Sequence, residues 1–283
     1  MGTDTLHIER NSVQETLVIP LCARKLCSDR YPDLFFDPDA ERLLARIDYD
    51  PSGLAAKSPA VMQIFGALEV ASRQYGLALE AAAYLKDHPH AAVVNLGCGL
   101  DTTFSRVDNG MCRGFNLDLP DVIAVRDTLL PPGEREANLA CDLNDPAWFD
   151  AVDFVASEGA VFYAAGVFYY FTVDQIRTLT AAMAKRFPGA ILVFDAANAR
   201  AVGLMRRTWI ERAGIEDVSA FFSLEDESEP AAWSERFASV TSRKYMEGYR
   251  TLPRTVRILN KLIAKAVDGP LMRQRIVRIV FRA

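Results

Sequence analysis

The sequence predicts an α/β fold in which helices cover a mostly parallel sheet, and three observations indicate it. Apolar strand-like segments alternate with segments whose apolar residues lie three and four positions apart, the spacing of an amphipathic helix. A glycine-rich turn, Gly97-Cys98-Gly99, follows the first strand-like segment of this alternating region. The longest apolar run, from Gly159 to Phe171, has thirteen residues, which is too few to span a bilayer and typical of a strand buried on both faces.

The N-terminal part of the chain is predicted to be mostly helical between residues 11 and 88. Ser58 followed by Pro59 indicates a helix start, because proline is favoured at the first helical position. A second helix, over residues 71–85, then leads into the first strand of the core. We therefore expect a helical cap, residues 1–88, followed by a core, residues 89–283, that contains the sheet.

The core continues with strands and helices in alternation, which indicates right-handed crossovers between parallel strands. The predicted elements are strands at 91–96, 113–118, 136–141, 160–165 and 190–195, and helices at 102–107, 120–129 and 173–186.

After Asp195 the alternation stops. Residues 196–240 are interpreted as an insertion long enough to form a lid, with a helix-like piece at 202–215 and a solvated acidic loop at 225–230. Two closing strands are expected at 242–247 and 275–281, joined by a helix at 253–267.

Three consecutive strand ends of this core carry residues suited to a nucleoside ligand. The first ends in Gly97-Cys98-Gly99, the second in Asp118 and the third in Asp142. The carboxyl ends of parallel strands line one crevice, where an acid at the second strand end can accept hydrogen bonds from ribose hydroxyls. Cys98 is expected to be a small residue that fills the turn rather than a nucleophile.

The ligand is not expected to be a dinucleotide, because Thr102 stands where the dinucleotide fingerprint requires a third glycine. The chain also has no G-x-x-x-x-G-K-[ST] phosphate loop. Two acidic strand ends without a pyrophosphate cradle favour a nucleoside with a cationic tail, such as S-adenosylmethionine. One acid would hold the ribose, and the other would meet the adenine amino group.

Four stretches of the core are similar to a known family: Gly97-Cys-Gly-Leu-Asp-Thr102, Asp118-Leu-Pro120, Phe187-Pro-Gly189 and Val193-Phe-Asp195. They resemble the leucine carboxyl methyltransferase family, particularly its polyketide O-methyltransferase branch of the tetracenomycin C-methyl-ester type. The N-terminal stretches at 15–24, 37–38 and 47–50 resemble the same branch. This resemblance implies a Rossmann-like S-adenosylmethionine-dependent methyltransferase fold with a seven-stranded sheet whose last strand is antiparallel.

The resemblance also implies which residues bind the cofactor. Arg73 matches the arginine that the family places against the methionine carboxylate, and Arg24 matches a basic position of the N-terminal cap. The expected cofactor-binding residues are Arg24, Arg73, Gly97, Cys98, Gly99, Asp118, Leu119, Asp142, Leu143 and Ala165. Tyr169 and Tyr170, which follow the fourth core strand, are the expected acceptor contacts.

Two positions depart from the family pattern. Thr103 stands where the common run continues with arginine, so a charge contact made there is absent. Ala165 stands where the family usually has glutamate, which puts any role of this position toward cofactor or acceptor in doubt. Asp195, at the end of the fifth core strand, could equally face the acceptor or cap the next helix.

Methyl transfer from a sulfonium is an in-line displacement, so the protein has to align the acceptor and exclude water. A carboxylate acceptor is ionised at neutral pH, whereas a phenol or alcohol requires a base. His7, His88 and His90 all lie in segments outside the predicted crevice, and no catalytic residue is assigned. The expected acceptor is a carboxylate or hydroxyl of a small, polyketide-like molecule; a protein C-terminus, methylated by another family member, is less favoured.

Composition excludes several classes of function. A net charge of −5 argues against a nucleic-acid partner. Five cysteines without a C-x-x-C pair, and three histidines without metal-ligand spacing, indicate reducing cytoplasm and no metal site. The polar N-terminus is not that of a signal peptide, and no membrane partner is expected. The oligomeric state is not predicted. A cofactor-binding protein without catalysis, and a nicotinamide-dependent oxidoreductase on a similar fold, remain alternatives.

Basic charge is concentrated near the C-terminus. Residues 243–282 contain eleven Lys or Arg and two acids, which leaves −14 for the rest of the chain. Leu252, Val256, Leu259 and Ile263 give this segment a basic amphipathic helix. Such a helix could meet an anionic partner or a membrane surface, although packing of its apolar stripe on the sheet is the commoner arrangement.

Overall fold

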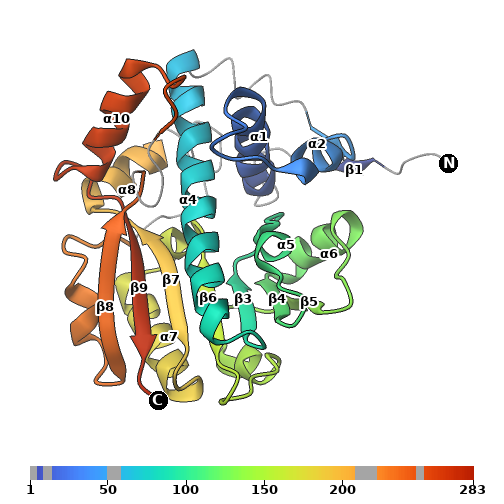
Figure 1. Ribbon diagram of the computed structural model, residues 1–283, viewed down its shortest axis with the longest axis vertical. Coiled ribbons are helices and arrows are strands. Elements are labelled where there is room, and N and C mark those ends of the chain that lie inside the picture. The colour runs from blue at the N-terminus through green and yellow to red at the C-terminus, as the bar shows by residue number, and fades with distance from the viewer. Residues whose placement is uncertain (1–4, 9–14, 50–58, 208–221, 247–251) are drawn as a thin grey trace.

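The computed structural model describes residues 5–8, 15–49, 59–207, 222–246 and 252–283, and every structural statement below concerns these residues. Its centre is a seven-stranded sheet in the order β5-β4-β3-β6-β7-β9-β8 (Figure 1). The strands are β3 Ala92–Leu96, β4 Arg113–Asp118, β5 Glu136–Ala140, β6 Ala160–Ala164, β7 Ile191–Ala196, β8 Phe237–Lys244 and β9 Arg275–Phe281. Strand β9 is antiparallel to both of its neighbours, β7 and β8, and the other described pairs of this sheet are parallel, which confirms the predicted sheet.

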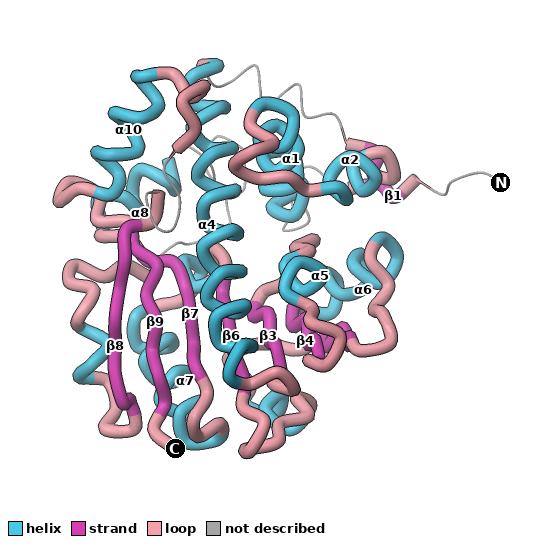
Figure 2. The backbone as a smooth tube through the Cα atoms, viewed as in Figure 1, coloured by secondary structure: helices cyan, strands magenta, loops and turns pink. Residues whose placement is uncertain are grey.

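Helices cover both faces of this sheet (Figure 2). The α-helices are α1 Glu15–Arg30, α2 Pro38–Leu44, α4 Ala60–Asp87, α5 Thr103–Val107, α6 Pro120–Leu129, α7 Val173–Arg186, α8 Ala199–Met205 and α10 Ile258–Asp268. Short 3₁₀ helices occupy Pro146–Asp150, Phe168–Tyr170 and Glu229–Ala232, and β1 Leu6–His7 pairs with β2 Ile47–Asp48. No described helix is long and apolar enough to cross a membrane.

The sheet residues alternate between two hydrophobic layers. Val93, Val161 and Val193 face the layer that contains α4, and Val94 and Phe162 face the layer that contains α7. Because helices cover both faces, the central strands β3, β6 and β7 are buried along their whole length. This explains why they appear in the sequence as continuous apolar runs.

Three elements differ from the prediction. The two helices expected around residues 58–85 are one helix, α4, which starts after Pro59; Ser58 lies outside the described residues. Its alanine-rich middle contains no proline, so nothing ends the helix there. Helix α10 begins at residue 258 instead of 253, because residues 253–256 form a turn closed by the Val256 amide and the Pro253 carbonyl.

Strand β8 begins at residue 237, five residues before its predicted start, so the expected insertion at 196–240 ends before 237. This strand lies at the edge of the sheet and most of its side chains are exposed, which removes the apolar signal that marks a buried strand. Within the insertion, α8 covers the start of the helix expected at 202–215, and residues 208–221 lie outside the described part.

The parallel strands end at one side of the molecule, where α1, α8 and α10 lie (Figure 1). Helix α4 runs from this side along the sheet and contacts both α1 and the strands β6, β7 and β9. Helix α4 ends at Asp87, so its residues all belong to the predicted cap. It nevertheless packs along the sheet of the predicted core.

Candidate functional site

The turn after β3 has the backbone geometry that its two glycines permit. Gly97 and Gly99 have φ values of +67° and +45°, in the left-handed region that residues with a side chain disfavour. The amides of Gly97 and Cys98 donate to the Leu117 carbonyl at 2.8 and 3.0 Å, which ties the turn to β4. A Cβ on Gly97 would lie 2.3 Å from Cγ2 of Val167. The turns that follow β3 and β6 are therefore in contact.

Cys98 lies inside this turn and is buried. Burial raises the pKa of its thiol above the ordinary value, so the thiol is not ionised at neutral pH. Its environment agrees with the expectation that Cys98 fills the turn rather than acting as a nucleophile.

Asp118, at the end of β4, is fixed by backbone amides. Its carboxylate accepts hydrogen bonds from the Gly99 amide at 2.7 Å and the Leu119 amide at 2.8 Å. Burial raises the pKa of this carboxyl above its ordinary value of 3.8. A carboxylate can accept about four hydrogen bonds, so Asp118 retains acceptor capacity for hydroxyl groups. Leu119 beside it is an exposed hydrophobic residue.

Asp142 and Leu143, after β5, have different environments. Asp142 is exposed, and its Oδ1 accepts hydrogen bonds from the backbone and side-chain amides of Asn144 at 2.9 and 3.0 Å. The Leu143 side chain is buried in the hydrophobic layer around Trp148. The carboxylate of Asp142 is thus open to solvent at the same sheet edge as Asp118, whereas the side chain of Leu143 packs inward.

A hydrogen-bond network below the glycine turn was not predicted. Asp101 accepts hydrogen bonds from Gln74 at 2.6 Å, from Asn95 at 3.2 Å, and from the backbone and hydroxyl groups of Thr103 at 2.7 and 3.0 Å. The bond to the Thr103 amide satisfies a backbone donor at the start of α5. Thr103, where the resemblance implies an arginine, is an uncharged residue that donates to the Asp101 carboxylate.

Two buried arginines hold the same turn from opposite sides. Arg126 on α6 donates from Nη1 to the carbonyls of Gly99 and Asp101, both at 2.8 Å. Arg24 on α1 donates from Nη2 to the Leu100 carbonyl at 2.7 Å, and its Nη1 lies 2.8 Å from Asp37. Arg24 thus stabilises the turn by donating to a backbone carbonyl, and its guanidinium forms an ion pair with Asp37. Arg126 was not predicted, because an arginine within an amphipathic helix carries no sequence signal for burial.

Arg73 lies at the ends of β6 and β7, within a cluster of polar groups. Its Nη1 is 3.5 Å from Oδ2 of Asp195, whose other oxygen accepts the Gly166 amide at 2.6 Å. Gly166 has a φ of +73°, and a Cβ there would lie 2.4 Å from Nη1 of Arg73. Asp195 therefore contacts both Arg73 and the turn at Gly166, where the missing side chain leaves space for the Arg73 guanidinium. The residue that caps the next helix, α8, is Asn198 and not Asp195.

Glu69 and Tyr245 complete this cluster, and neither was predicted. Glu69 lies one helical turn before Arg73, so both face the same side of α4; it accepts a hydrogen bond from Gln274 at 2.7 Å. Burial raises the pKa of Glu69 above its ordinary value. Burial also raises the pKa of Tyr245, so this tyrosine stays protonated beside Arg73. The i, i+4 spacing of Glu69 and Arg73 was the available signal.

The two predicted acceptor contacts differ in exposure. Tyr169 is buried near Arg73 and Asp195, and its hydroxyl has no hydrogen-bond partner among the described residues. Tyr170 is 41 % exposed. Ala165 packs against the layer that contains α4. An unsatisfied buried hydroxyl has a free energy cost, which a polar ligand group would relieve.

The histidines lie away from this crevice. His88 stacks on Tyr84 with ring centroids 4.3 Å apart, where α4 ends before the amino end of β3. His7 is exposed and contacts Asp48 in the small β1–β2 pair. The titratable side chains nearest to Arg73 are carboxylates and tyrosines.

Comparisons with known proteins agree with this architecture. The family model described as leucine carboxyl methyltransferase matches residues 18–184. The chain is 30 % identical over 190 residues to the tetracenomycin polyketide synthesis O-methyltransferase TcmP of Streptomyces glaucescens, which covers 67 % of each protein.

Two solved structures show the same fold at low sequence identity. A candidate methyltransferase from Thermobifida fusca superposes with a TM-score of 0.61 at 13 % identity, over 94 % of both chains. A DUF574 family protein from Streptomyces avermitilis gives a TM-score of 0.58 at 12 % identity, over 93 % of this chain and 97 % of that one.

Proposed function

The chain belongs to the leucine carboxyl methyltransferase family and is an S-adenosylmethionine-dependent methyltransferase, and we propose that it methylates an oxygen atom of a small molecule. The similarity to a polyketide O-methyltransferase supports this class of acceptor. The proposed acceptor group is a carboxylate or a hydroxyl.

The contact between two turns is the observation that carries the proposal. Through Gly97 and Val167, it brings the Asp118 end of the crevice next to the Arg73 end. Asp118, held by the Gly99 amide, is suited to the ribose hydroxyls, and Arg73 is suited to the methionine carboxylate. Both partners fit the chemistry of S-adenosylmethionine, which supplies an electrophilic methyl group on a sulfonium sulfur.

The remaining predicted residues have secondary roles in this proposal. Gly97, Cys98 and Gly99 shape the turn, and exposed Leu119 and Asp142 lie where the adenine would bind. Arg24 braces the turn from the cap. Tyr169 and Tyr170 lie beside Arg73, where the acceptor would meet the methyl group. The protein aligns the acceptor oxygen and excludes water, which is what an in-line displacement requires.

The test measures both binding and product. We expect S-adenosylhomocysteine, and not NAD, to raise the melting temperature of the protein. Incubation with S-adenosylmethionine and a set of aromatic acids and phenols should then release S-adenosylhomocysteine. Mild alkaline hydrolysis of the product identifies the acceptor group, since a methyl ester releases methanol and an aryl methyl ether does not.

Three outcomes decide between the candidates. Stabilisation by NAD alone would overturn the proposal. Binding of S-adenosylhomocysteine without turnover of any acceptor would favour a protein that retains the site without catalysis, an alternative that Ala165 supports as a departure from the family pattern. Turnover that is lost in Asp118→Asn but kept in Asp121→Asn, a nearby exposed aspartate on α6, would support the assigned site.

A further inference from the structure

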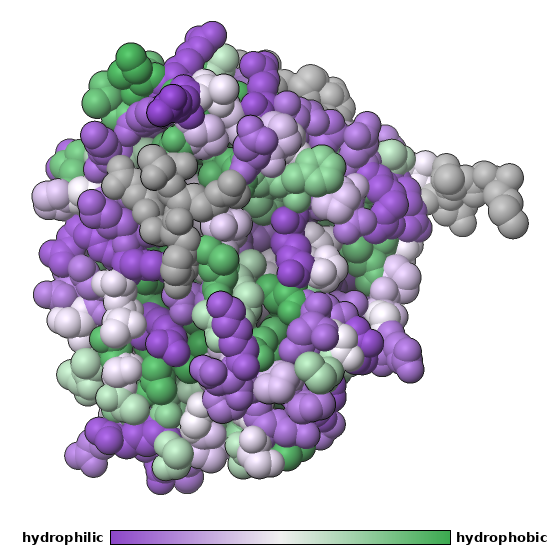
Figure 3. Space-filling view, in the orientation of Figure 1, coloured by the Kyte–Doolittle hydropathy of each residue, from purple (hydrophilic) through white to green (hydrophobic). Residues whose placement is uncertain are grey.

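Helix α10 presents a hydrophobic surface that the described residues leave uncovered. Ile258, Leu259 and Leu262 on this helix are 77 %, 54 % and 58 % exposed. Its other face, with Ala264 and Val267, packs in the layer that contains α4. Figure 3 shows hydrophobic side chains at the surface over α10, at the upper left. Of the predicted stripe, Leu252, Val256 and Ile263 pack on the layer that contains α4, as in the commoner arrangement, and Leu259 is exposed.

Four basic residues lie on α10 or in the segment just before it. Arg254, Arg257, Lys261 and Lys265 follow one another at intervals of three and four residues. None of their side chains has an ionic partner among the described residues, although many other arginines of the surface pair with carboxylates. Residues 252–267 contain no acid. The charge of this segment is thus uncompensated within the described part of the chain.

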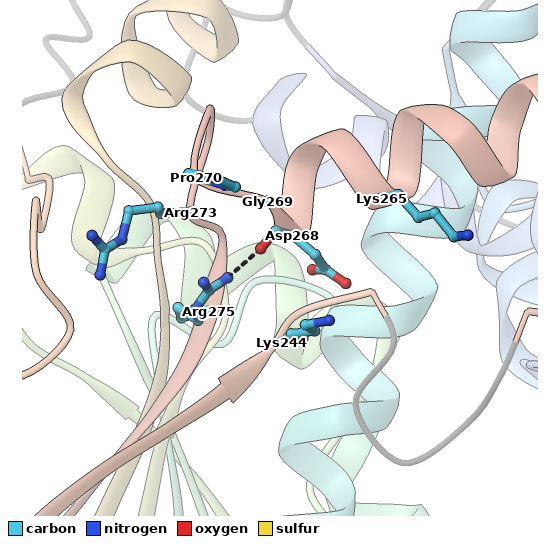
Figure 4. Close-up of a pocket in the computed structure, with 7 residues that line it drawn as sticks. All are labelled: Lys244, Lys265, Asp268, Gly269, Pro270, Arg273 and Arg275. Atoms are coloured by element: carbon cyan, nitrogen blue, oxygen red, sulfur yellow. Dashed lines mark hydrogen bonds between the residues drawn. The ribbon is translucent and has the colours of Figure 1, made fainter.

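A basic cavity lies at the C-terminal end of α10, away from the glycine turn (Figure 4). It has a volume of about 510 Å³ and is lined by Lys244, Lys265, Asp268, Gly269, Pro270, Arg273 and Arg275. Arg273 and Arg275 pair with Glu227, and Arg275 also donates to the Asp268 carbonyl at 2.8 Å. Among the described residues, Lys244, Lys265, Arg273 and Arg275 stand against the carboxylates of Asp268 and Glu227, so cations are in excess here. Lys265 belongs to both the cavity and the basic side of α10.

We infer that α10 and this cavity form a docking surface for an anionic lipid bilayer. An interfacial helix inserts its apolar side chains among the lipid chains and places its lysines and arginines at the level of anionic head groups. Ile258, Leu259 and Leu262 supply the apolar side, and Lys261 and Lys265 supply the basic side. The cavity is suited to the phosphate of a head group.

A bilayer fits this surface better than a protein partner does. Three exposed aliphatic side chains cover far less than the roughly 800 Å² per partner that a stable protein interface buries. A bilayer requires only shallow insertion of apolar side chains beside a positive rim, and the small patch with its flanking cations supplies both.

The experiment is sedimentation of the full chain with vesicles of phosphatidylcholine alone or mixed equally with phosphatidylglycerol. We expect binding to the mixed vesicles only, weakened by added salt. Lys261→Glu/Lys265→Glu should lower partitioning by at least about tenfold, because each basic residue near an anionic surface contributes roughly fivefold. Leu262→Ser should also weaken binding, and at 58 % exposure it should fold normally.

The matched control is Lys86→Glu/Lys185→Glu. These exposed lysines end α4 and α7, at the opposite end of the sheet, and their reversal changes the net charge equally. Control and wild type should bind alike. Equal binding to both vesicle types, no binding to either, or equal loss in the control would overturn the inference. So would a dimer in solution that Leu262→Ser dissociates, since a second copy would then cover this surface.

Discussion

Asp118 connects the backbone of the glycine turn to the proposed cofactor chemistry. The amides of Gly99 and Leu119 fix its carboxylate, and burial raises its pKa. A carboxylate orients two ribose hydroxyls as an acceptor only while it is ionised, whereas its protonated form is itself a donor. Ligand binding at this residue should therefore depend on pH.

We predict that affinity for S-adenosylhomocysteine falls as the pH is lowered through the pKa of Asp118. Because that pKa is raised, the loss should begin at a higher pH than an ordinary aspartate, with a pKa of 3.8, would give. Asp118→Asn should weaken binding at neutral pH by about 1.5–3 kcal/mol, the value of hydrogen bonds to charged groups. It should also flatten the pH dependence. Calorimetry across the acidic range measures both, with Asp87→Asn, an exposed aspartate at the end of α4, as control; an unchanged slope in Asp118→Asn would refute the assignment.

At the scale of single residues, a role can be predicted from the sequence where it depends on residues that are close along the chain. The Gly97–Gly99 turn and the carboxylate after β4 could be placed because each lies at the end of an apolar strand. The hydrogen bond from Gln74 to Asp101 could not, since Gln74 lies on α4, 27 residues away along the chain. Arg126 and Tyr245 were missed for the same reason: their roles depend on tertiary contacts.

At the scale of elements, strands buried on both faces were predicted almost to the residue. Strand β4 and helices α6 and α7 have the predicted bounds. In α7 the side chains of Thr172 and Gln175 form a capping box, a local signal that fixes the start. The edge strand β8 and the uninterrupted α4 were mispredicted, because exposure removes the apolar pattern and a helix without proline has no internal stop signal.

The connection after β6 gives a prediction at this scale. Gly166 and Gly189 both have positive φ, +73° and +78°. A Cβ on Gly166 would meet Arg73 at 2.4 Å, whereas a Cβ on Gly189 meets nothing within 4 Å. Alanine at either position should lower the free energy of unfolding by about 1–2 kcal/mol, the cost of the left-handed conformation.

Only Gly166→Ala should also displace Arg73 from its place against Asp195. We therefore expect it to weaken S-adenosylhomocysteine binding by roughly tenfold or more, as for the loss of a charge-assisted hydrogen bond. Gly189→Ala should bind like the wild type. Urea unfolding and calorimetry on the two variants separate backbone strain from the effect on Arg73. Equal affinities in both variants would show that Arg73 does not hold the cofactor.

At the scale of the whole molecule, a buried ion pair lies where the N-terminal helices meet the turn after β3, beside the packing of α1 on Leu100. Arg24 and Asp37 lie 2.8 Å apart, and their side chains are 4 % and 0 % exposed. Arg24 also donates to the Leu100 carbonyl and to Thr102. Asp37 caps α2 through the Asp39 amide. The pair therefore links α1, α2 and the β3 turn, which the sequence showed only as a basic position in the cap.

Removing Arg24 leaves the buried Asp37 carboxylate with the more distant Arg106, at 3.9 Å, as its ionic partner, and neutralising Asp37 leaves the buried Arg24 guanidinium without this ion pair. We predict that Arg24→Met lowers the free energy of unfolding by about 3–5 kcal/mol. Asp37→Asn, which keeps an oxygen to cap α2, should lower it by a smaller amount. The double variant should lose less than the sum of the two, since neither buried charge then remains, and a coupling of about 1–3 kcal/mol is expected for residues in direct contact. Urea unfolding of the four proteins measures this coupling. Additive losses would mean that Arg24 and Asp37 act independently, so that their ion pair does not stabilise the fold.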